Sequence, residues 1–316
     1  MIKIVPMKTS DIPDVLKLWK IQFKKYCSND AFPDFSKGGE SVIESYITKQ
    51  IKTGNAISAL EDNKLAGFMA WMSFDFHNEK TSFLPITGHT ASVTNKEEIY
   101  SEMYRYVSEK WVRDNIFNHL WMIYYDDRDF LDDVYRIGFG SYVIDACQSV
   151  KKNIKTINCG YRIAIAAVEN ADDLLEFANT STEYYIKAPI FLKRTGFTKD
   201  KITSIIENDC VLIARDQDKI VGAMSFSTDQ NFHFEHLTTM DSSYIGGIGA
   251  FIHPDYRGRG IGTALLEKTF EICAEKGKQY IHVSFESANP NASKFWPKYF
   301  KPGIRSVRRT INKDAN

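Results

Sequence analysis

The residues most suited to chemistry form one short run, Arg257-Gly258-Arg259-Gly260-Ile261-Gly262, just ahead of a stretch of apolar residues. The first N–H groups of a helix have no acceptor within the helix, and the helix dipole places about half a positive charge there. Glycines let an anion approach the backbone closely, and guanidinium groups add cationic donors. If a helix starts inside this run, the run predicts a site for a multiply charged anion such as a pyrophosphate.

The flanking sequence supplies the elements that such a site needs. The apolar run Ala250-Phe251-Ile252 is typical of a buried strand, and Pro254 ends it because proline cannot donate to a ladder. Behind the glycines, Ile261, Leu265, Thr269 and Ile272 recur at helical spacing and form one ridge. The segment 245–278 therefore predicts a strand, a glycine-rich turn and a helix. It is not a P-loop, because no Lys-Ser or Lys-Thr follows the last glycine, and its third glycine comes one residue early for a dinucleotide fingerprint.

The motif Arg257-x-x-Gly260-x-Gly262 resembles the acyl-CoA motif of the GNAT superfamily of N-acyltransferases, and His253–Tyr256 and Thr263–Leu266 extend the likeness. A tight strand-to-helix turn with chance arginines is the alternative reading. The resemblance implies acetyl-CoA as cofactor and direct acetyl transfer to an amine, without a covalent enzyme intermediate. It implies cofactor binding by Arg257, Gly258, Arg259, Gly260, Ile261, Gly262 and Thr263, and by the backbone of Ala250, Phe251 and Ile252.

The catalytic residues depart from the family pattern. Gly246 stands where some family members carry a glutamate base, and Trp296 stands where the usual tyrosine acid would be. Glu286 and Glu235 are the substitutes that we expect for the base, with His233 and His236 as alternatives. Tyr299 is the substitute for the acid, with Ser284, Ser287 or water as alternatives.

Three further residues are expected to contact the cofactor: Asn289, Asn291 and Trp296. For the two asparagines, capping of the last helix is an equal alternative. His233 and His236 invite a metal reading, but residues three apart on a strand point to opposite faces and no third ligand is nearby. We therefore predict no metal.

The composition of the whole chain limits the classes of protein. A length of 316 residues suggests two domains, and a net charge of zero gives no basic footprint for nucleic acid. No apolar run reaches the roughly 18 residues that a membrane-spanning helix needs. The start leads straight into a strand, and the five cysteines form no C-x-x-C pair. These features predict a cytoplasmic protein with reduced thiols.

The two halves of the chain resemble each other. Ala59–Met69 and Ala214–Met224 carry Lys, Gly and Met at the same places, and both are expected to be hairpins. Asp14-Val15-Leu16 likewise matches Asp173-Leu174-Leu175 after the first strand of each half, and two matches in the same order favour an internal duplication. The fold class is therefore predicted as α/β, an α+β mixed sheet in two tandem GNAT folds, with domains 1–152 and 153–316. The third strand of the first half is expected at Leu65–Phe74, and a strand of the second half at Asn231–Thr238.

The first half lacks the anion motif. Thr87–Asn95, at the corresponding place, has one glycine and no arginine, so we expect this half not to hold acyl-CoA well. The prediction for the whole chain is an acetyl-CoA-dependent N-acetyltransferase that acts on an amine of a small molecule or peptide, as a monomer or homodimer. The first domain would close the acceptor cleft or mimic a dimer partner. A non-catalytic acyl-CoA-binding or regulatory module and a longer acyl donor are the alternatives.

Overall fold

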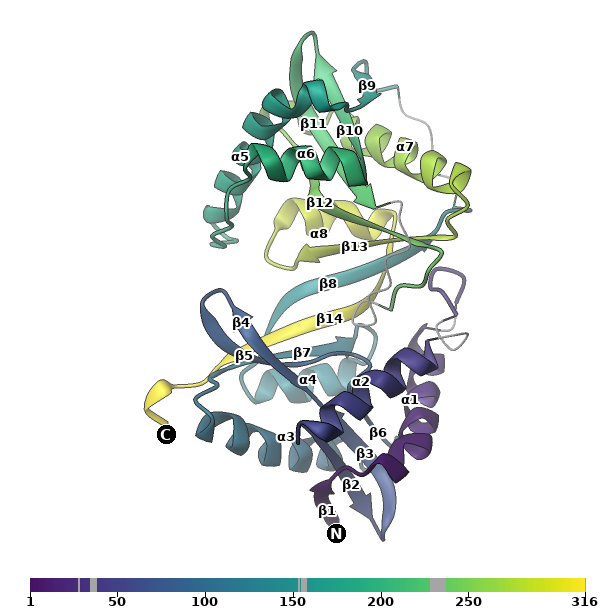
Figure 1. The fold of residues 1–316 in the computed structure, drawn as a ribbon, viewed down its shortest axis with the longest axis vertical. Coiled ribbons are helices and arrows are strands. Elements are labelled where there is room, and N and C mark those ends of the chain that lie inside the picture. Colours follow the sequence, from purple (N-terminus) through teal and green to yellow (C-terminus); the bar gives the residue numbers. More distant parts are fainter. Residues whose placement is uncertain (28, 35–38, 153, 155–157, 228–236, 316) are drawn as a thin grey trace.

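The computed structural model describes residues 1–27, 29–34, 39–152, 154, 158–227 and 237–315. Two halves of similar construction lie one above the other along the long axis of the molecule (Figure 1). Within the described residues, no helix is both long enough and apolar enough to cross a membrane.

Strands and helices of the first half alternate in a mixed α/β order. Its elements are β1 (Ile2–Pro6), α1 (Ile12–Cys27), α2 (Glu40–Lys52), β2 (Ala56–Glu61), β3 (Lys64–Ala70), β4 (Met72–Phe76), β5 (Glu79–Leu84), β6 (His89–Ala91), α3 (Lys96–Arg113), β7 (Asn118–Tyr124), α4 (Arg128–Arg136) and β8 (Gly140–Ser149).

The second half repeats this order. Its elements are β9 (Arg162–Ile165), α5 (Ala171–Ile186), α6 (Lys199–Asn208), β10 (Asp209–Asp216), β11 (Lys219–Ser227), β12 (Ser242–Ile252), α7 (Ile261–Glu275), β13 (Tyr280–Glu286), α8 (Pro290–Phe295) and β14 (Lys301–Thr310).

The two halves exchange their last strands. A ten-stranded sheet runs in the order β4-β5-β7-β14-β8-β13-β12-β11-β10-β9, and a four-stranded sheet has the order β1-β2-β3-β6. β14 of the second half pairs antiparallel with β7 of the first, and β8 of the first half pairs antiparallel with β13 of the second. Each half therefore lends a strand to its neighbour. The division into domains 1–152 and 153–316 stays a prediction, because the ten-stranded sheet takes strands from both segments.

The fourth strand position differs between the halves. In the first half, β5 pairs parallel with β7 while the separate β6 pairs antiparallel with β3. In the second half the single strand β12 does both: Ser242–Ile245 pair parallel with β13, and the later residues pair antiparallel with β11. The prediction of one continuous third strand over Leu65–Phe74 is wrong, because the strand is interrupted at Trp71. It ends as β3 at Ala70, and β4 begins at Met72.

Each sheet region is covered by helices on both faces, which explains why central strands such as β7 and β11 are buried along almost their whole length. In the first half α1 and α2 pack on one face and α3 and α4 on the other. In the second half α5 and α6 cover one face and α7 and α8 the other. Alternate residues of β10 accordingly enter different cores: Val211 and Ile213 on the α5–α6 side, and Leu212 and Ala214 on the α7 side.

Candidate active site

The start of α7 has the geometry predicted for the anion site. Gly258 and Gly260 have left-handed backbones, with φ of +76° and +82°. The first bond of the helix runs from Ala264 N–H to Gly260 C=O, so the preceding amides have no acceptor within the helix. A Cβ placed on Gly258 would meet nothing within 4 Å. The backbone amides at this corner are thus open to a ligand.

The two arginines lie beside this helix start. Arg257 donates from Nε to the carbonyl of Ile252 at 3.1 Å, and its guanidinium lies 4.5 Å from the ring centre of Tyr184. Arg259 donates to the Tyr161 hydroxyl and to the Asp255 carbonyl, both at 2.9 Å. Arg257 therefore joins the end of β12 to α5, while Arg259 fixes the turn itself.

β12 contains a bulge opposite β11, and the bulge begins where the pairing of β12 with β13 ends. Parallel pairing between them ends at Ile245 and Val283. On the other edge Phe226 pairs with Ile245 and Met224 pairs with Ala250, so four residues of β12 stand opposite Ser225 alone. The Ser225 hydroxyl is fully buried, accepts from the Ile248 N–H at 2.9 Å and donates to the Gly246 carbonyl. It therefore holds the bulge that lets the end of β12 leave its neighbour.

The splayed end of β12 presents backbone groups to the gap. His253 N–H donates to the carbonyl of Val221 in β11 at 2.9 Å. Because backbone groups alternate along a strand, the N–H groups of Ile252 and Ala250 point away from β11, and those of Phe251 point toward it. Two of the three residues predicted to bind the pantetheine arm by backbone bonds thus face the gap, with Ile252 next to the helix start.

The last helix closes the other side of this gap. Asn289 caps α8, because its side-chain oxygen accepts from the N–H groups of Asn291 at 3.2 Å and Ala292 at 3.3 Å. The Asn291 amide donates to the Tyr184 hydroxyl at 2.5 Å. A Cβ on Gly262 would lie 3.4 Å from Phe295, so the start of α7 and the end of α8 approach closely there.

Two aromatic residues after α8 differ in position. Trp296 is 6% exposed and packs against Phe295 and Phe300 in the core. Its predicted contact with the cofactor stays a prediction. The Tyr299 hydroxyl lies 2.9 Å from Oγ1 of Thr263, in the first turn of α7. Tyr299, predicted as the acid, therefore stands at the helix start.

The predicted base Glu286 lies at the end of β13 and forms an ion pair with Arg194. The Arg194 guanidinium stacks on Tyr185, 3.6 Å from its ring centre. Burial, and then the charge of Glu286, raise the pKa of Tyr185. Glu235, the other predicted base, and His233 and His236 lie outside the described residues.

Sequence reasoning missed Ser225 and Arg194. Ser225 directly follows the repeated segment Ala214–Met224, and its counterpart after Ala59–Met69 is Ala70. The loss of a hydroxyl between two otherwise similar segments was the available signal. Arg194 gave none, because its partner Glu286 lies far away in the sequence.

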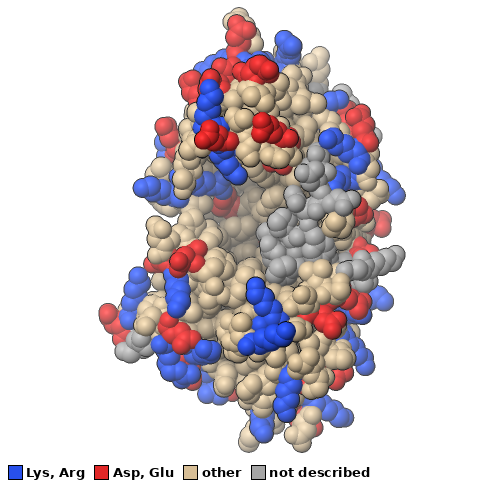
Figure 2. All heavy atoms as spheres, in the orientation of Figure 1, with Lys and Arg blue, Asp and Glu red and all other residues tan. Residues whose placement is uncertain are grey.

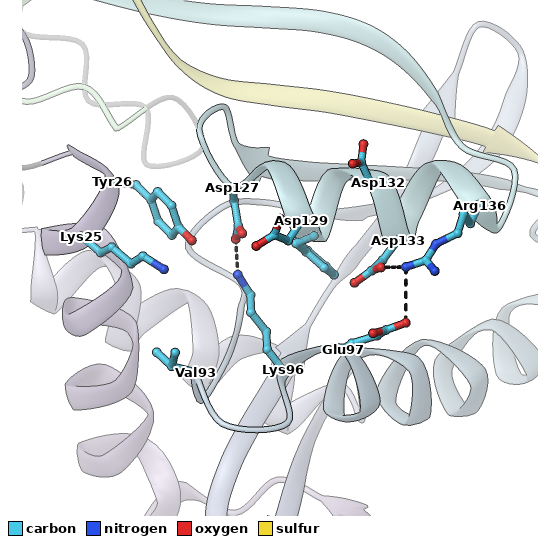
Figure 3. A pocket seen from close by; sticks show the side chains of 11 residues that line it. Lys25, Tyr26, Val93, Lys96, Glu97, Asp127, Asp129, Asp132, Asp133 and Arg136 are labelled. Atoms are coloured by element: carbon cyan, nitrogen blue, oxygen red, sulfur yellow. Dashed lines mark hydrogen bonds and ion pairs between the residues drawn. The ribbon is translucent and has the colours of Figure 1, made fainter.

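The first half has a cavity of about 570 Å³ at the corresponding helix start, that of α3. Figure 3 shows Lys96 paired with Asp127, and Arg136 paired with Glu97 and Asp133. Tyr26 lies across the cavity from them. The cavity is lined by Lys25, Tyr26, Val93, Lys96, Glu97, Asp127, Asp129, Phe130, Asp132, Asp133 and Arg136. Carboxylates outnumber cations in this lining, which disfavours a polyphosphate.

Known proteins resemble this chain in sequence and in structure. Residues 171–300 match the model of the Acetyltransferase (GNAT) family. An uncharacterized N-acetyltransferase of Methanocaldococcus jannaschii is 23% identical over 171 residues, which cover 54% of this chain and 69% of that protein.

Two solved structures share the fold. A GCN5-related N-acetyltransferase of Sphaerobacter thermophilus superposes with a TM-score of 0.62 at 14% identity, over 98% of this chain and 96% of that one. A glucosamine N-acetyltransferase region of a fungal multi-domain GH3 β-N-acetylglucosaminidase superposes with a TM-score of 0.57 at 12% identity, over 98% of this chain and 38% of that one. At such identities the likeness concerns the fold, and it extends over both halves. The predicted fold class is confirmed.

Proposed function

We propose that this chain moves an acetyl group from acetyl-CoA directly to an amine of a small molecule or peptide, because residues 171–300 match the model of the Acetyltransferase (GNAT) family. One observation carries the proposal. The open amides at the start of α7 and the outward N–H groups of Ala250 and Ile252 lie on one continuous path along the gap beside β12.

The residues present fit coenzyme A. A diphosphate suits the glycine-flanked helix start beside Arg257, because the amides and the guanidinium all donate toward an anion. An extended pantetheine arm suits the unpaired edge of β12, where it would take the place of a neighbouring strand. The Ile252 N–H would then polarise the thioester carbonyl.

Proton transfer is proposed for two side chains. Tyr299 is the candidate donor to the leaving thiolate, because its hydroxyl stands at the start of α7. Glu286 is the candidate acceptor for the ammonium proton, acting through water, because Arg194 already binds one of its oxygens. Glu235 stays a second candidate.

Gly262→Glu tests the site. A glutamate in the first turn favours the helix dipole, so folding should be retained, but its charge would repel the diphosphate. We expect calorimetry to show acetyl-CoA binding weakened by more than about a hundredfold. The matched variant Gly262→Ala adds only a methyl group near Phe295 and should bind within about twofold of the natural protein. Equal affinity of the glutamate variant would refute the site.

A non-catalytic acyl-CoA-binding protein is the second candidate. The buried Trp296 in place of a tyrosine favours it. Release of free thiol from acetyl-CoA, measured with a panel of amines, separates the two functions, because a binding module would release none.

A further inference from the structure

A hollow lies between the two halves. Figure 2 shows the surface recessed at mid-height of the molecule, where Figure 1 places β13 and β8 between the lower end of α5 and the tip of the β4–β5 hairpin. Glu286 at the end of β13 belongs to the second half, and the hairpin belongs to the first. The recess therefore has one wall from each half.

The wall from the second half is acidic at its base. The Glu286 side chain is 12% exposed and is held by Arg194, which is 40% exposed. The ring of Tyr185, at the end of α5, stacks against the Arg194 guanidinium. A buried carboxylate that keeps one charged partner at its rim can also attract an ammonium group.

The wall on the side of the first half carries a cation, Arg308, which lies in β14, the strand that the second half lends to this part of the sheet. His77 at the hairpin tip lies 3.3 Å, Nε2 to hydroxyl oxygen, from Tyr142 of β8. The guanidinium of Arg308 in β14 lies 5.8 Å from the ring centre of Phe76 and 5.9 Å from that of Tyr142. One of its terminal nitrogens donates to Asn118 at 3.1 Å and forms an ion pair with Glu79 at 3.4 Å, and Lys313 binds the other oxygen of Glu79 at 3.4 Å. The two cations therefore share one carboxylate, and the buried Nε of Arg308 has no partner.

The charges divide the recess into two ends. Burial, and then the charges of Arg308 and Arg194, lower the pKa of His77, so both guanidinium groups act on the hairpin tip. Burial, and then the charge of Glu286, raise the pKa of Tyr142, although Arg308 and Arg194 oppose this. The end nearest β13 thus holds the carboxylate of Glu286 with its partner Arg194, and the end nearest the hairpin holds the guanidinium of Arg308.

We propose that the acceptor is a primary amine that also carries an anionic group. It lies in this recess with its amine toward Glu286 and its anionic group toward Arg308 and the hairpin tip. The inference rests on the proposed acetyltransferase function and adds the class of substrate. It also gives the first half a task, because that half contributes to the wall that selects the acceptor.

Pairs of amines that differ by one anionic group test the proposal. Phenylalanine is compared with phenethylamine, and O-phosphoethanolamine with ethanolamine, in an assay of thiol release from acetyl-CoA. In at least one pair we expect kcat/KM to be about tenfold higher for the anionic member, which is the usual effect of a charge-assisted hydrogen bond. The pair that responds tells a carboxylate from a phosphate.

Other outcomes overturn it. Equal or reversed preference in both pairs, or no turnover with any of the four amines while calorimetry shows acetyl-CoA binding, rejects the anionic acceptor and leaves the cofactor site standing. If acetyl-CoA itself does not bind, the proposed function fails, and this inference fails with it.

Variants locate the selecting charge. Arg308→Gln should reduce the preference at least about fivefold, while Arg308→Lys keeps most of it. Arg309→Gln is the matched control, because Arg309 points to the opposite face of β14 and donates to Tyr104. His77→Glu tests the same idea if the Arg308 variant does not fold. His77 lies in an exposed turn, and a carboxylate there would repel the anionic group of the acceptor. Acetyl-CoA affinity by calorimetry should stay within about twofold in all four. An unchanged preference in both Arg308→Gln and His77→Glu rejects the assignment.

Discussion

The starts of α3 and α7 occupy corresponding places in the two halves, but they have opposite chemistry. In α7 the residue before the helix is Gly260 and the second helical residue is Gly262, whereas α3 has Asn95 and Glu97 there. Both starts keep a cation over a tyrosine ring: Arg257 lies 4.5 Å from the ring centre of Tyr184, and Lys96 lies 5.6 Å from that of Tyr26. In the first half, however, Lys96 is also bound by Asp127. The first half thus retains the architecture of the site and has filled its anion position with carboxylates.

Residues that hold helix against sheet have been kept in both halves. A Cβ on Gly67 would lie 2.7 Å from Cγ2 of Ile99 in α3, and one on Gly222 would lie 2.9 Å from Cγ2 of Ile261 in α7. Ser225, which holds the bulge of β12, corresponds instead to Ala70. The two halves therefore share a glycine that lets a helix pack closely on the sheet, and they differ at the residue that holds the bulge.

The largest effect expected from this comparison concerns pH and the first half. His89 is fully buried, donates from Nε2 to the Met122 carbonyl at 2.6 Å and accepts at Nδ1 from the Tyr100 hydroxyl at 2.9 Å. Burial lowers its pKa from 6.5 to about 4. Below pH 6.5 the unfolded chain binds a proton there and the folded protein does not, so stability falls as the pH falls toward 4. At pH 5 the loss from this residue is about 2 kcal/mol.

Urea unfolding at pH 7 and pH 5 measures this effect. The variant His89→Gln can make the same two hydrogen bonds but does not titrate, so its stability should change less between the two pH values. His119, buried in the same half with its pKa also lowered to about 4 by burial, adds to the loss in both proteins. Equal pH dependence of the variant and the natural protein would show that His89 is not responsible.

The next effect is steric and should be similar in both halves. Gly67→Ala and Gly222→Ala should each lower the free energy of unfolding by about 1–3 kcal/mol, because the added methyl group pushes α3 or α7 off the sheet. Gly54→Ala, where a Cβ would meet nothing within 4 Å but φ is +71°, is a control for backbone strain alone. A Gly67 variant as stable as the natural protein would mean that the first half packs less tightly than its counterpart.

The sequence predicted the second half better than the first, for physical reasons. The motif Arg257–Thr263 is a continuous short segment, so the local spacing of its residues was enough to predict the strand, the turn and the helix. The split of the first-half strand at Trp71 depends on how β4 and β5 join the neighbouring sheet, which is not a local property.

The exchange of β8 and β14 between the halves could not be predicted from the sequence either. Each strand has the apolar content of an ordinary final strand, and only its partner, more than a hundred residues away in the case of β13 and β8, shows that it has crossed over. The pairing of Glu286 with Arg194 has the same cause. Long-range contacts of this kind leave no periodic pattern in the sequence.

Ser225 gives a smaller effect, limited to the second half. Removal of its hydroxyl in Ser225→Ala should let the bulge of β12 relax and should weaken acetyl-CoA binding about tenfold by calorimetry. Ser227→Ala is the matched control on the same strand, since its hydroxyl accepts from the Tyr244 N–H at 3.2 Å, outside the bulge. If the two variants bind acetyl-CoA equally, Ser225 serves stability alone. Recovery of affinity in Ser225→Thr would instead support the positioning role.

The smallest effect is expected where the halves differ most visibly. Glu97→Gly gives α3 the glycine that α7 has at its second position, and it removes only an exposed ion pair with Arg136. We expect calorimetry still to show one acetyl-CoA bound per chain with unchanged affinity. Asp127 still binds Lys96 at the same helix start, and Ala70 cannot hold a bulge as Ser225 does. A second bound acetyl-CoA in this variant would mean that one carboxylate alone had closed the first site, and that the strand geometry beside it had never been lost.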